Sequence, residues 1–209
     1  AGSIGSEIVR QLIAYFPSKI ILVDQSESGL FDLEYELSSL IPTNTELVVK
    51  IADVTDKNRL AAIFRTHKPS LVFHAAAYKH VPLMEKNAYE AVKVNILGTQ
   101  TLADLAVDHG VDKFIMVSTD KAVNPTNVMG ATKRFAEMYT QSLNGKEGIQ
   151  TKYIATRFGN VLGSSGSVIP LFKKQIERGG PVTVTHPEIT RYFMTIPEAC
   201  ELEIGRAHV

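Results

Sequence analysis

The 209-residue sequence has little cysteine, no excess of either charge and no long apolar run. Its single cysteine, Cys200, excludes an internal disulfide framework and favours a reducing compartment. No segment approaches the roughly 18 apolar residues of a membrane-spanning helix, and the sequence does not open on a signal peptide. A formal net charge of +0 argues against a general nucleic-acid-binding protein. We therefore expect a soluble, cytoplasmic chain that contacts neither nucleic acid nor membrane.

Both ends of the sequence look cut. It opens on the residues 1–5, Ala-Gly-Ser-Ile-Gly, which resemble the middle of a glycine-rich turn that needs a strand before it. Residues 203–209 abruptly drop the pattern of the preceding segment, and we interpret them as a non-native tail read in frame from a sequencing adapter, with a genuine polar tail as the alternative. A fragment without its first strand is expected to be inactive by itself.

Short apolar runs alternate with longer amphipathic stretches along residues 1–160, which predicts an α/β fold with a Rossmann-like, doubly wound parallel sheet. The expected strands are 20–24, 47–51, 71–74, 114–117 and 153–156. The expected helices are 3–16, 28–40, 57–68, 88–109, 129–143 and 168–178. Residues 1–160 would form an NAD-binding domain and residues 161–202 part of a substrate-binding region, with strand-like pieces near Val182 and Tyr192.

The first motif is a pair of glycines, Gly2 and Gly5, that lead directly into a helix. Glycines allow a pyrophosphate to approach the backbone, and a helix N-terminus offers N–H groups and a positive dipole end. Asp24 ends the next strand, where a carboxylate accepts ribose hydroxyls and repels a 2′-phosphate, so we predict NAD rather than NADP. A helix-capping aspartate is the alternative. The predicted cofactor residues in this region are Gly2, Ser3, Ile4, Gly5 and Asp24.

Two further strand ends supply predicted cofactor contacts. Asp53 and Val54 follow the strand at 47–51, where a carboxylate could meet the adenine amino group, although a plain loop aspartate fits nearly as well. Small residues after the strand at 71–74 leave room for a cofactor against the backbone, with tight helix–sheet packing as the alternative; they are Ala75, Ala76 and Ala77. Asn95 lies in a helix expected beneath this loop, where a buried amide could brace it.

The chemistry is expected after the strand at 114–117, in the runs Ser118-Thr119-Asp120-Lys121 and 129–133. The layout resembles the extended short-chain dehydrogenase/reductases that modify nucleotide sugars. Their Tyr-x-x-x-Lys helix stacks a tyrosine and a lysine on one face, and the lysine binds the nicotinamide ribose and activates the tyrosine as a base. Here Lys133 matches the lysine, but Met129 stands at the tyrosine position and cannot act as a base.

A narrower resemblance accounts for the methionine. The runs 118–133, 75–82 and 157–164 are similar to the polysaccharide-biosynthesis branch, the UDP-N-acetylglucosamine 4,6-dehydratases, whose large, usually membrane-anchored members commonly carry methionine there. The resemblance covers residues 1–202 and implies NAD, a UDP-sugar substrate and a homo-oligomer. It also implies oxidation at C4, loss of water across C5–C6 and return of the hydride to C6.

The resemblance assigns roles residue by residue. Thr119 would hold O4, Asp120 would protonate the leaving hydroxyl, and Lys121 would take the C5 proton. A surface ion pair is the alternative for Asp120 and Lys121. The catalytic set is then Thr119, Asp120, Lys121, Met129 and Lys133, with Ser118 and Lys133 also contacting the cofactor.

The substrate-binding residues are assigned in the same way. An asparagine and a bidentate arginine suit a pyrophosphate, and an apolar Val-Ile-Pro turn suits uracil. These residues are Asn160, Val168, Ile169, Pro170 and Arg191, with Lys79 and His80 facing cofactor or sugar. Each has an ordinary structural alternative, and we assign no metal ligands. An epimerase of the same fold and a catalytically inactive NAD-binding sensor are the rival functions.

Overall fold

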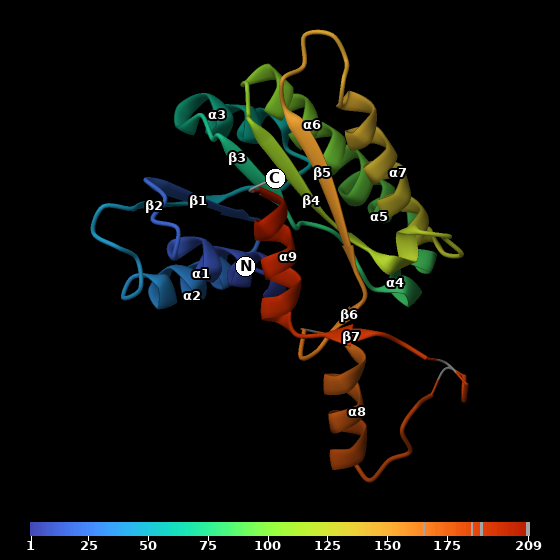
Figure 1. The fold of residues 1–209 in the computed structure, drawn as a ribbon. Coiled ribbons are helices and arrows are strands. Elements are labelled where there is room, and N and C mark those ends of the chain that lie inside the picture. Colours follow the sequence, from blue (N-terminus) through green and yellow to red (C-terminus); the bar gives the residue numbers. More distant parts are fainter. Residues whose placement is uncertain (165, 185, 189, 208–209) are drawn as a thin grey trace.

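Strands and helices alternate from Ser3 to Phe158 in the computed structural model, which describes residues 1–164, 166–184, 186–188 and 190–207 (Figure 1). The first elements are α1 (Ser3–Ile13), β1 (Lys19–Asp24), α2 (Glu27–Leu37), β2 (Glu46–Ile51), α3 (Lys57–His67) and β3 (Leu71–His74). They are followed by α4 (Val81–Lys86), α5 (Ala88–Ala91), the π-helix η1 (Val92–Gly98), α6 (Thr99–Asp108) and β4 (Lys113–Thr119). Next come the 3₁₀-helix η2 (Asp120–Ala122), α7 (Val128–Leu143) and β5 (Lys152–Phe158). This order confirms the predicted α/β fold class.

The helix boundaries follow local chemistry. Ser26, Asp56 and Asn127 precede α2, α3 and α7, and each side chain accepts a hydrogen bond from the backbone N–H three residues later. Helix α1 ends at Ile13 rather than at the predicted residue 16, because Phe16 takes a left-handed φ of 50° before a proline. Among the described residues, no helix combines the length and the apolar character needed to cross a bilayer.

Strands β1 to β5 form two separate parallel sheets where the sequence predicted a single doubly wound sheet. β1 pairs with β2, and β4 pairs with β3 on one side and β5 on the other. In the described part of the chain no pairing joins β1 to β3. This break is where the sequence analysis expected a central strand to be missing.

Each sheet has its own apolar core. Ile20, Leu22 and Leu30 belong to the core that β1 and β2 share with the neighbouring helices. A larger core around Phe114 and Met116 lies between the β3–β4–β5 sheet and the helices α3, α6 and α7. The last helix, α9 (Ile196–Ala207), packs on β4 and β5 and also on α1, so it connects the two sheets (Figure 1).

The chain leaves the alternating pattern after β5. Two short strands, β6 (Asn160–Val161) and β7 (Phe193–Met194), pair in parallel, and α8 (Val168–Glu177) projects away from the sheets (Figure 1). The predicted strand near Val182 is wrong: the segment is irregular, and the Thr183 backbone N–H donates to the Gln175 side chain rather than to a strand. In the predicted Gly/Ser stretch at 163–166, residue 165 lies outside the described residues.

Helix α9 continues through the segment that the sequence analysis set apart as a tail. Glu203 and Ile204 are buried, and the helix extends to Ala207; residues 208–209 lie outside the described residues. The change of sequence pattern at Glu203 is therefore not a change of secondary structure. The non-native origin of residues 203–209 stays a prediction.

Candidate active site

The start of α1 meets the end of β1. The Ala1 amino group lies 2.7 Å from Asp24 Oδ2, which places the first turn of α1 beside this carboxylate. Gly2 is the N-cap of α1 and makes no side-chain cap, and a Cβ added at Gly2 or at Gly5 would meet no atom within 4 Å. The protein's own packing therefore does not require these glycines, and the space over the helix N-terminus is open. The structure brings together the predicted set Gly2, Ser3, Ile4, Gly5 and Asp24.

Asp53 follows β2, and its carboxylate forms hydrogen bonds within its own turn. Its Oδ1 accepts hydrogen bonds from the backbone N–H and the hydroxyl of Thr55, both at 2.8 Å. Val54 packs against η1, where a Cβ at Gly98 would lie 2.8 Å from its methyl carbon. Both residues thus have structural roles, as the loop-aspartate alternative expects, and their contact with adenine stays a prediction.

The loop after β3 rests on a buried polar chain. His74 Nε2 lies 2.8 Å from Thr99 Oγ1, and Thr99 donates its hydroxyl proton to the Asn95 carbonyl at 2.7 Å. His74 Nε2 must therefore carry the proton that it shares with Thr99. Burial first, and the nearby Lys133 ammonium second, lower the pKa of His74 to about 3, so this imidazole is neutral.

Asn95 braces that loop, as the sequence predicted. Its Oδ1 accepts from the Tyr78 N–H at 2.8 Å, and its Nδ2 donates to the Tyr78 carbonyl and to Thr132 Oγ1, both at 3.0 Å. The Asn95 amide thus binds the loop at Tyr78, one residue beyond Ala77, and connects it to α7 through Thr132. Asn95 lies within the seven-residue π-helix η1, a rare form that often accompanies functional sites.

The carboxyl end of β4 carries three polar side chains in one hydrogen-bonded set. Asp120 Oδ1 accepts from Thr119 Oγ1 and from Lys121 Nζ, both at 2.9 Å. Burial raises the pKa of Asp120, but the hydrogen bonds from Lys121 and Thr119 outweigh it and lower the pKa overall. The pair is partly open to solvent, with 48% of the Asp120 side chain and 27% of the Lys121 side chain exposed. It can therefore meet a ligand while its charges stay paired.

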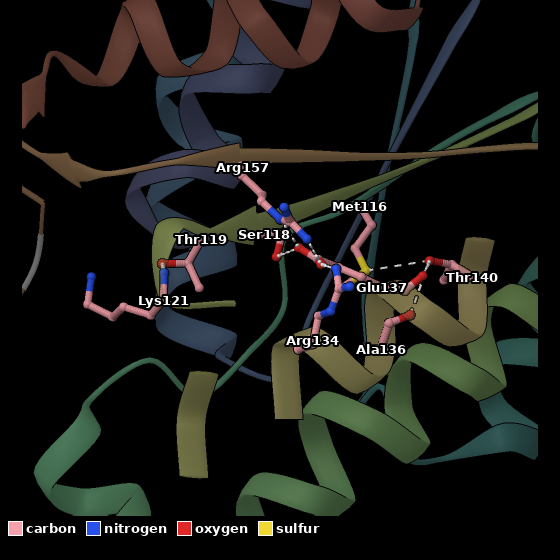
Figure 2. Close-up of polar contacts among 9 residues, drawn as sticks. All are labelled: Met116, Ser118, Thr119, Lys121, Arg134, Ala136, Glu137, Thr140 and Arg157. Atoms are coloured by element: carbon pink, nitrogen blue, oxygen red, sulfur yellow. Dashed lines mark hydrogen bonds and ion pairs between the residues drawn. The ribbon is translucent and has the colours of Figure 1, made fainter. Parts of the chain in front are cut away.

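This set is held against the first turn of α7 by a close backbone approach. A Cβ at Gly130 would overlap the Lys121 carbonyl oxygen. Only glycine therefore allows η2 to approach the helix so closely. Figure 2 shows Thr119 and Lys121 on one side of the strand end, while Ser118 points to the other side.

Lys133 lies beneath this strand end and is buried. Its ammonium donates to the Val117 carbonyl at 2.6 Å. Burial lowers the pKa of Lys133 to about 8, although the negative charges of Glu137 and Glu203 oppose this decrease. Lys133 is therefore a cation near neutral pH that can lose its proton in mildly basic solution.

Met129 and Ser118 were predicted as site residues, but in the structure both side chains contact other parts of the protein. Met129 is 3% exposed and belongs to an apolar cluster with Met84 and Ala91, so its thioether is part of the packing beneath α4 and α5. Ser118 donates its hydroxyl proton to Glu137 Oε1 at 2.5 Å (Figure 2). Its hydroxyl is thus engaged inside the protein, and the predicted contact with a cofactor stays a prediction.

The sequence matches the family described as polysaccharide biosynthesis protein over residues 1–208. This chain belongs to that family. It is 59% identical over 201 residues to the capsular polysaccharide biosynthesis protein CapD of Staphylococcus aureus. It is also 40% identical over 207 residues to a UDP-N-acetylglucosamine 4,6-dehydratase (inverting) of Campylobacter jejuni subsp. jejuni. These alignments cover 96% and 98% of this chain but 33% and 60% of the two relatives.

Solved structures share the fold of this polysaccharide biosynthesis family member. Pen from Bacillus thuringiensis superposes with a TM-score of 0.90 at 35% identity, over 100% of this chain and 65% of that one. A double mutant of DesIV, a dTDP-glucose 4,6-dehydratase from Streptomyces venezuelae solved with NAD and DAU bound, gives a TM-score of 0.80 at 25% identity, over 96% and 67%.

The predicted substrate residues of this family member lie in its C-terminal part and in the loop before α4. The Asn160 backbone N–H donates to the Tyr192 carbonyl, which places Asn160 next to the segment of the exposed Arg191. The Asn160 Nδ2 is buried without a hydrogen-bond partner among the described residues. The apolar turn begins α8, and its residues are Val168, Ile169 and Pro170.

Lys79 and His80 precede α4. Lys79 is exposed overall, and the partial desolvation of its ammonium group lowers its pKa. His80 lies against Gly166, where an added Cβ would be 2.6 Å from the imidazole Cε1, so this loop contacts the segment before α8. The structure thus joins two predicted substrate regions that are far apart in the sequence.

The sequence analysis missed two charged residues beside the site, Glu137 and Arg157. Glu137 is completely buried and forms an ion pair with Arg157 at 2.5 Å. The available signal was spacing, because Glu137 follows Lys133 by four residues and shares its helix face. Arg157 begins the run 157–164 that carries the resemblance, but no partner could be assigned to it from the sequence, since its role depends on the register between β4 and β5.

Proposed function

We propose that the full-length protein carrying this chain catalyses NAD-dependent 4,6-dehydration of a UDP-N-acetylhexosamine to a 4-keto-6-deoxy sugar for polysaccharide synthesis. The observation that carries this proposal is the hydrogen-bonded set of Thr119, Asp120 and Lys121 at the end of β4. A relative named UDP-N-acetylglucosamine 4,6-dehydratase supports the same reaction and substrate class.

We infer that NAD binds where the start of α1 meets the end of β1. The residues fit this group: the helix N-terminus attracts a pyrophosphate, Gly2 and Gly5 leave open space, and Asp24 can accept ribose hydroxyls. DesIV, solved with NAD, shares the fold. Bound NAD would supply the hydride acceptor for C4 and return the hydride at C6. The remaining proposed contacts are Asp53, Val54, Ala75, Ala76, Ala77, Asn95, Ser118 and Lys133.

At the end of β4, Lys121 and Asp120 each carry out one proton transfer. Lys121 takes the proton from C5, which the C4 ketone makes acidic, and Asp120 donates a proton to the C6 hydroxyl as it leaves as water. In the structure the two side chains form an ion pair at 2.9 Å, with the proton on Lys121. One proton transfer along this hydrogen bond gives the neutral pair that both roles require. A bound sugar that excludes water favours the neutral pair, because low dielectric penalises both charges.

Met129 takes no part in proton transfer in this proposal. Its burial in the apolar cluster with Met84 and Ala91 supports a packing role. The O4 proton passes through the Thr119 hydroxyl or a water molecule to solvent water, because Asp120 already holds the proton that it took from Lys121. Thr119 suits this step because it belongs to the same hydrogen-bonded set, with its hydroxyl 2.9 Å from Asp120 Oδ1.

The UDP group is assigned to the C-terminal part of the chain. Asn160 offers an unpartnered amide among the described residues, and Arg191 offers an exposed guanidinium for the pyrophosphate. The start of α8 would flank uracil, and Lys79 and His80 would face the sugar or the cofactor.

We also infer that the protein self-associates. Large apolar side chains are exposed on α5 and α7, which pack together: Tyr89 is 76% exposed, and Phe135 and Met138 are each 56% exposed. Exposed apolar surface of this kind favours a protein interface. Conversion between monomer and oligomer is measurable by sedimentation.

Product analysis of the full-length protein tests the reaction. Incubation with UDP-N-acetylglucosamine should give a product that has lost one water and carries a ketone, detected by mass spectrometry and by trapping with hydroxylamine. A product of unchanged mass and inverted C4 would instead identify an epimerase. Cofactor binding without turnover of any nucleotide sugar would identify an inactive NAD-binding sensor, which the methionine at position 129 favours.

A further inference from the structure

A buried ionic cluster lies directly beneath the strand end that carries Thr119 and Asp120. Its centre is Glu137 on α7, whose side chain is completely buried. Figure 2 shows Ser118, Arg157 and Arg134 converging on this carboxylate. A buried carboxylate is costly unless it is paired and hydrogen-bonded, so its partners identify the elements that it holds together.

Glu137 is fully partnered from three elements. Ser118 Oγ on β4 donates to Oε1 at 2.5 Å, and Arg157 on β5 donates through Nε to Oε1 at 2.8 Å and through Nη2 to Oε2 at 2.5 Å. Arg134, on α7 itself, donates to Oε2 at 3.3 Å. Burial raises the pKa of Glu137, but the hydrogen bonds from Arg157 and Ser118 outweigh it and lower the pKa overall. The Glu137 carboxylate is therefore ionised, and it holds Ser118 and Arg157 together. We call this group of contacts the clamp.

The strand register makes this clamp possible. Ser118 and Arg157 are direct neighbours across the parallel β4–β5 pair, so both side chains leave the sheet on the face that α7 covers. Glu137 lies where it can contact both at once. Because Ser118 immediately precedes Thr119, the clamp acts on the last residue before the reactive set.

Helix α7 holds β4 at two successive points. Lys133 Nζ donates to the Val117 carbonyl at 2.6 Å, and Glu137 accepts from the hydroxyl of the next residue, Ser118. Lys133 and Glu137 are four residues apart on one helix face, so two consecutive turns of α7 contact two consecutive residues of β4. These two contacts fix the position of Thr119 relative to Lys133.

We propose that Glu137 is a positioning residue of the active site, which acts through Ser118 to hold Thr119 and Asp120 at the distance from Lys133 that the reaction needs. The inference rests on the proposed function, because it concerns the geometry of that same site. A positioning role differs from a purely structural role in one respect. Loss of the hydrogen bond between Ser118 and Glu137 should lower the rate of the chemical step more than it lowers the stability of the fold or the affinity for ligands.

Ser118→Ala and Thr140→Val in the full-length protein form a matched pair for the test. Each variant removes one buried hydroxyl beside Glu137. The Thr140 hydroxyl donates to the carbonyls of Ala136 and Glu137 on its own helix, and it contacts β4 through Met116 Sδ at 3.9 Å, two residues before Ser118. Both are expected to lower the melting temperature by similar small amounts. Only Ser118→Ala should lower kcat, by about tenfold or more, since misplacement of reacting groups by an ångström costs up to about a hundredfold. KM for the UDP-sugar should change far less. The NAD dissociation constant should also change far less, because the Ser118 hydroxyl already donates to Glu137 and the proposed contact of Ser118 with NAD is assigned to its backbone.

Glu137→Gln, which keeps the shape and removes the charge, should reduce kcat at least as much as Ser118→Ala. If Glu137→Gln does not fold, the Ser118→Ala comparison still decides. An active wild-type protein in which Ser118→Ala matches Thr140→Val in kcat overturns the positioning role and leaves the proposed function intact. If the wild-type protein epimerises rather than dehydrates, the same kcat comparison applies, because both reactions begin at C4. A wild-type protein that turns over no nucleotide sugar contradicts both proposals.

Discussion

At the scale of single residues, the proposed chemistry depends on two neighbours with opposite charges. Asp120 and Lys121 are adjacent in sequence, and their side chains meet at 2.9 Å rather than pointing apart. The ordinary alternative, a surface ion pair, has the same contact but no consequence for turnover. The two interpretations differ in what happens to the C5 hydrogen of a bound sugar.

Separate substitutions of these neighbours distinguish their roles. Lys121→Ala in the full-length protein should abolish exchange of the C5 hydrogen with deuterated water, because it removes the base. Asp120→Asn should retain measurable exchange, because Lys121 without its carboxylate partner can lose its proton to solvent instead. Water loss should fall by about a hundredfold or more, because an amide is no proton donor for the leaving hydroxyl. Isotope incorporation followed by mass spectrometry measures both. Lys146→Ala, in the exposed loop after α7, is the control and should behave as wild type. Full dehydration by Asp120→Asn would contradict the assignment.

Other residues illustrate how far the sequence could be interpreted alone. Asn95 was predicted to brace the loop after β3, and its amide hydrogen bonds to Tyr78 confirm the bracing. Met129 was identified at the tyrosine position, but its burial against Met84 was not predictable, because α4 and α7 approach each other only in the folded chain. Neighbour identity in a core depends on tertiary packing, which a single sequence does not reveal.

At the scale of elements, the contact between η2 and α7 determines where the reactive residues lie. Asn127 caps α7, and Gly130 in its first turn allows the Lys121 carbonyl to approach. The glycine has a cost, since glycine within a helix is about 1 kcal/mol less favourable than alanine. Its presence is explained by the approach of η2 and not by the needs of the helix.

Gly130→Ala tests this packing directly. The added Cβ would overlap the backbone at Lys121, so η2 must shift and kcat should fall by about tenfold or more, even though helix propensity favours alanine. Gly205→Ala in α9 of the 209-residue chain is the matched control for stability, because its added Cβ meets nothing within 4 Å, and it should retain or slightly raise the melting temperature. Steady-state kinetics of Gly130→Ala in the full-length protein, and thermal unfolding of both variants in the 209-residue chain, measure the difference. Wild-type kcat in Gly130→Ala would show that η2 does not depend on this contact.

At the scale of the whole molecule, α9 connects two sheets that share no strand pairing in the described residues. It contacts α1 as well as β4 and β5, so its buried face belongs to both halves. Glu203 lies on that face and is 0% exposed, and neither of its carboxylate oxygens has a hydrogen-bond partner among the described residues. A buried, unpartnered carboxylate destabilises the fold.

The stability of the chain should therefore depend on pH through Glu203. Burial raises the pKa of Glu203 to about 7, although Thr156 and Lys133 lower it in part. The folded chain then binds a proton that the unfolded chain has lost between pH 4.5 and about 7, so stability falls as the pH rises through this window. The full effect is on the order of 3 kcal/mol, from about 1.4 kcal/mol per pKa unit.

Thermal unfolding of the 209-residue chain at about pH 5.5 and pH 7.5 measures the upper part of this window. Glu203→Gln should reduce the loss of melting temperature between the two values, and Glu203→Leu should raise the melting temperature most at the higher pH. Carboxylates with lowered pKa, such as Glu137, lose their contribution only below the ordinary range. His74, with a folded pKa of about 3 against an ordinary value of 6.5, opposes Glu203 below pH 6.5, so the difference between wild type and Glu203→Gln isolates the Glu203 effect. An equal pH dependence in wild type and Glu203→Gln would contradict the prediction.

The sequence by itself determined the alternation of strands and helices, the loops that follow the strands and the residue types at their ends. These features depend on local periodicity, capping and turn chemistry, and they extend over a few residues. Only the tertiary structure decided that Ser118 and Arg157 meet on Glu137, that Met129 packs in a core and that Glu203 is buried between two sheets. Those contacts join residues far apart in the chain, and strand register and helix packing select them from many possible partners.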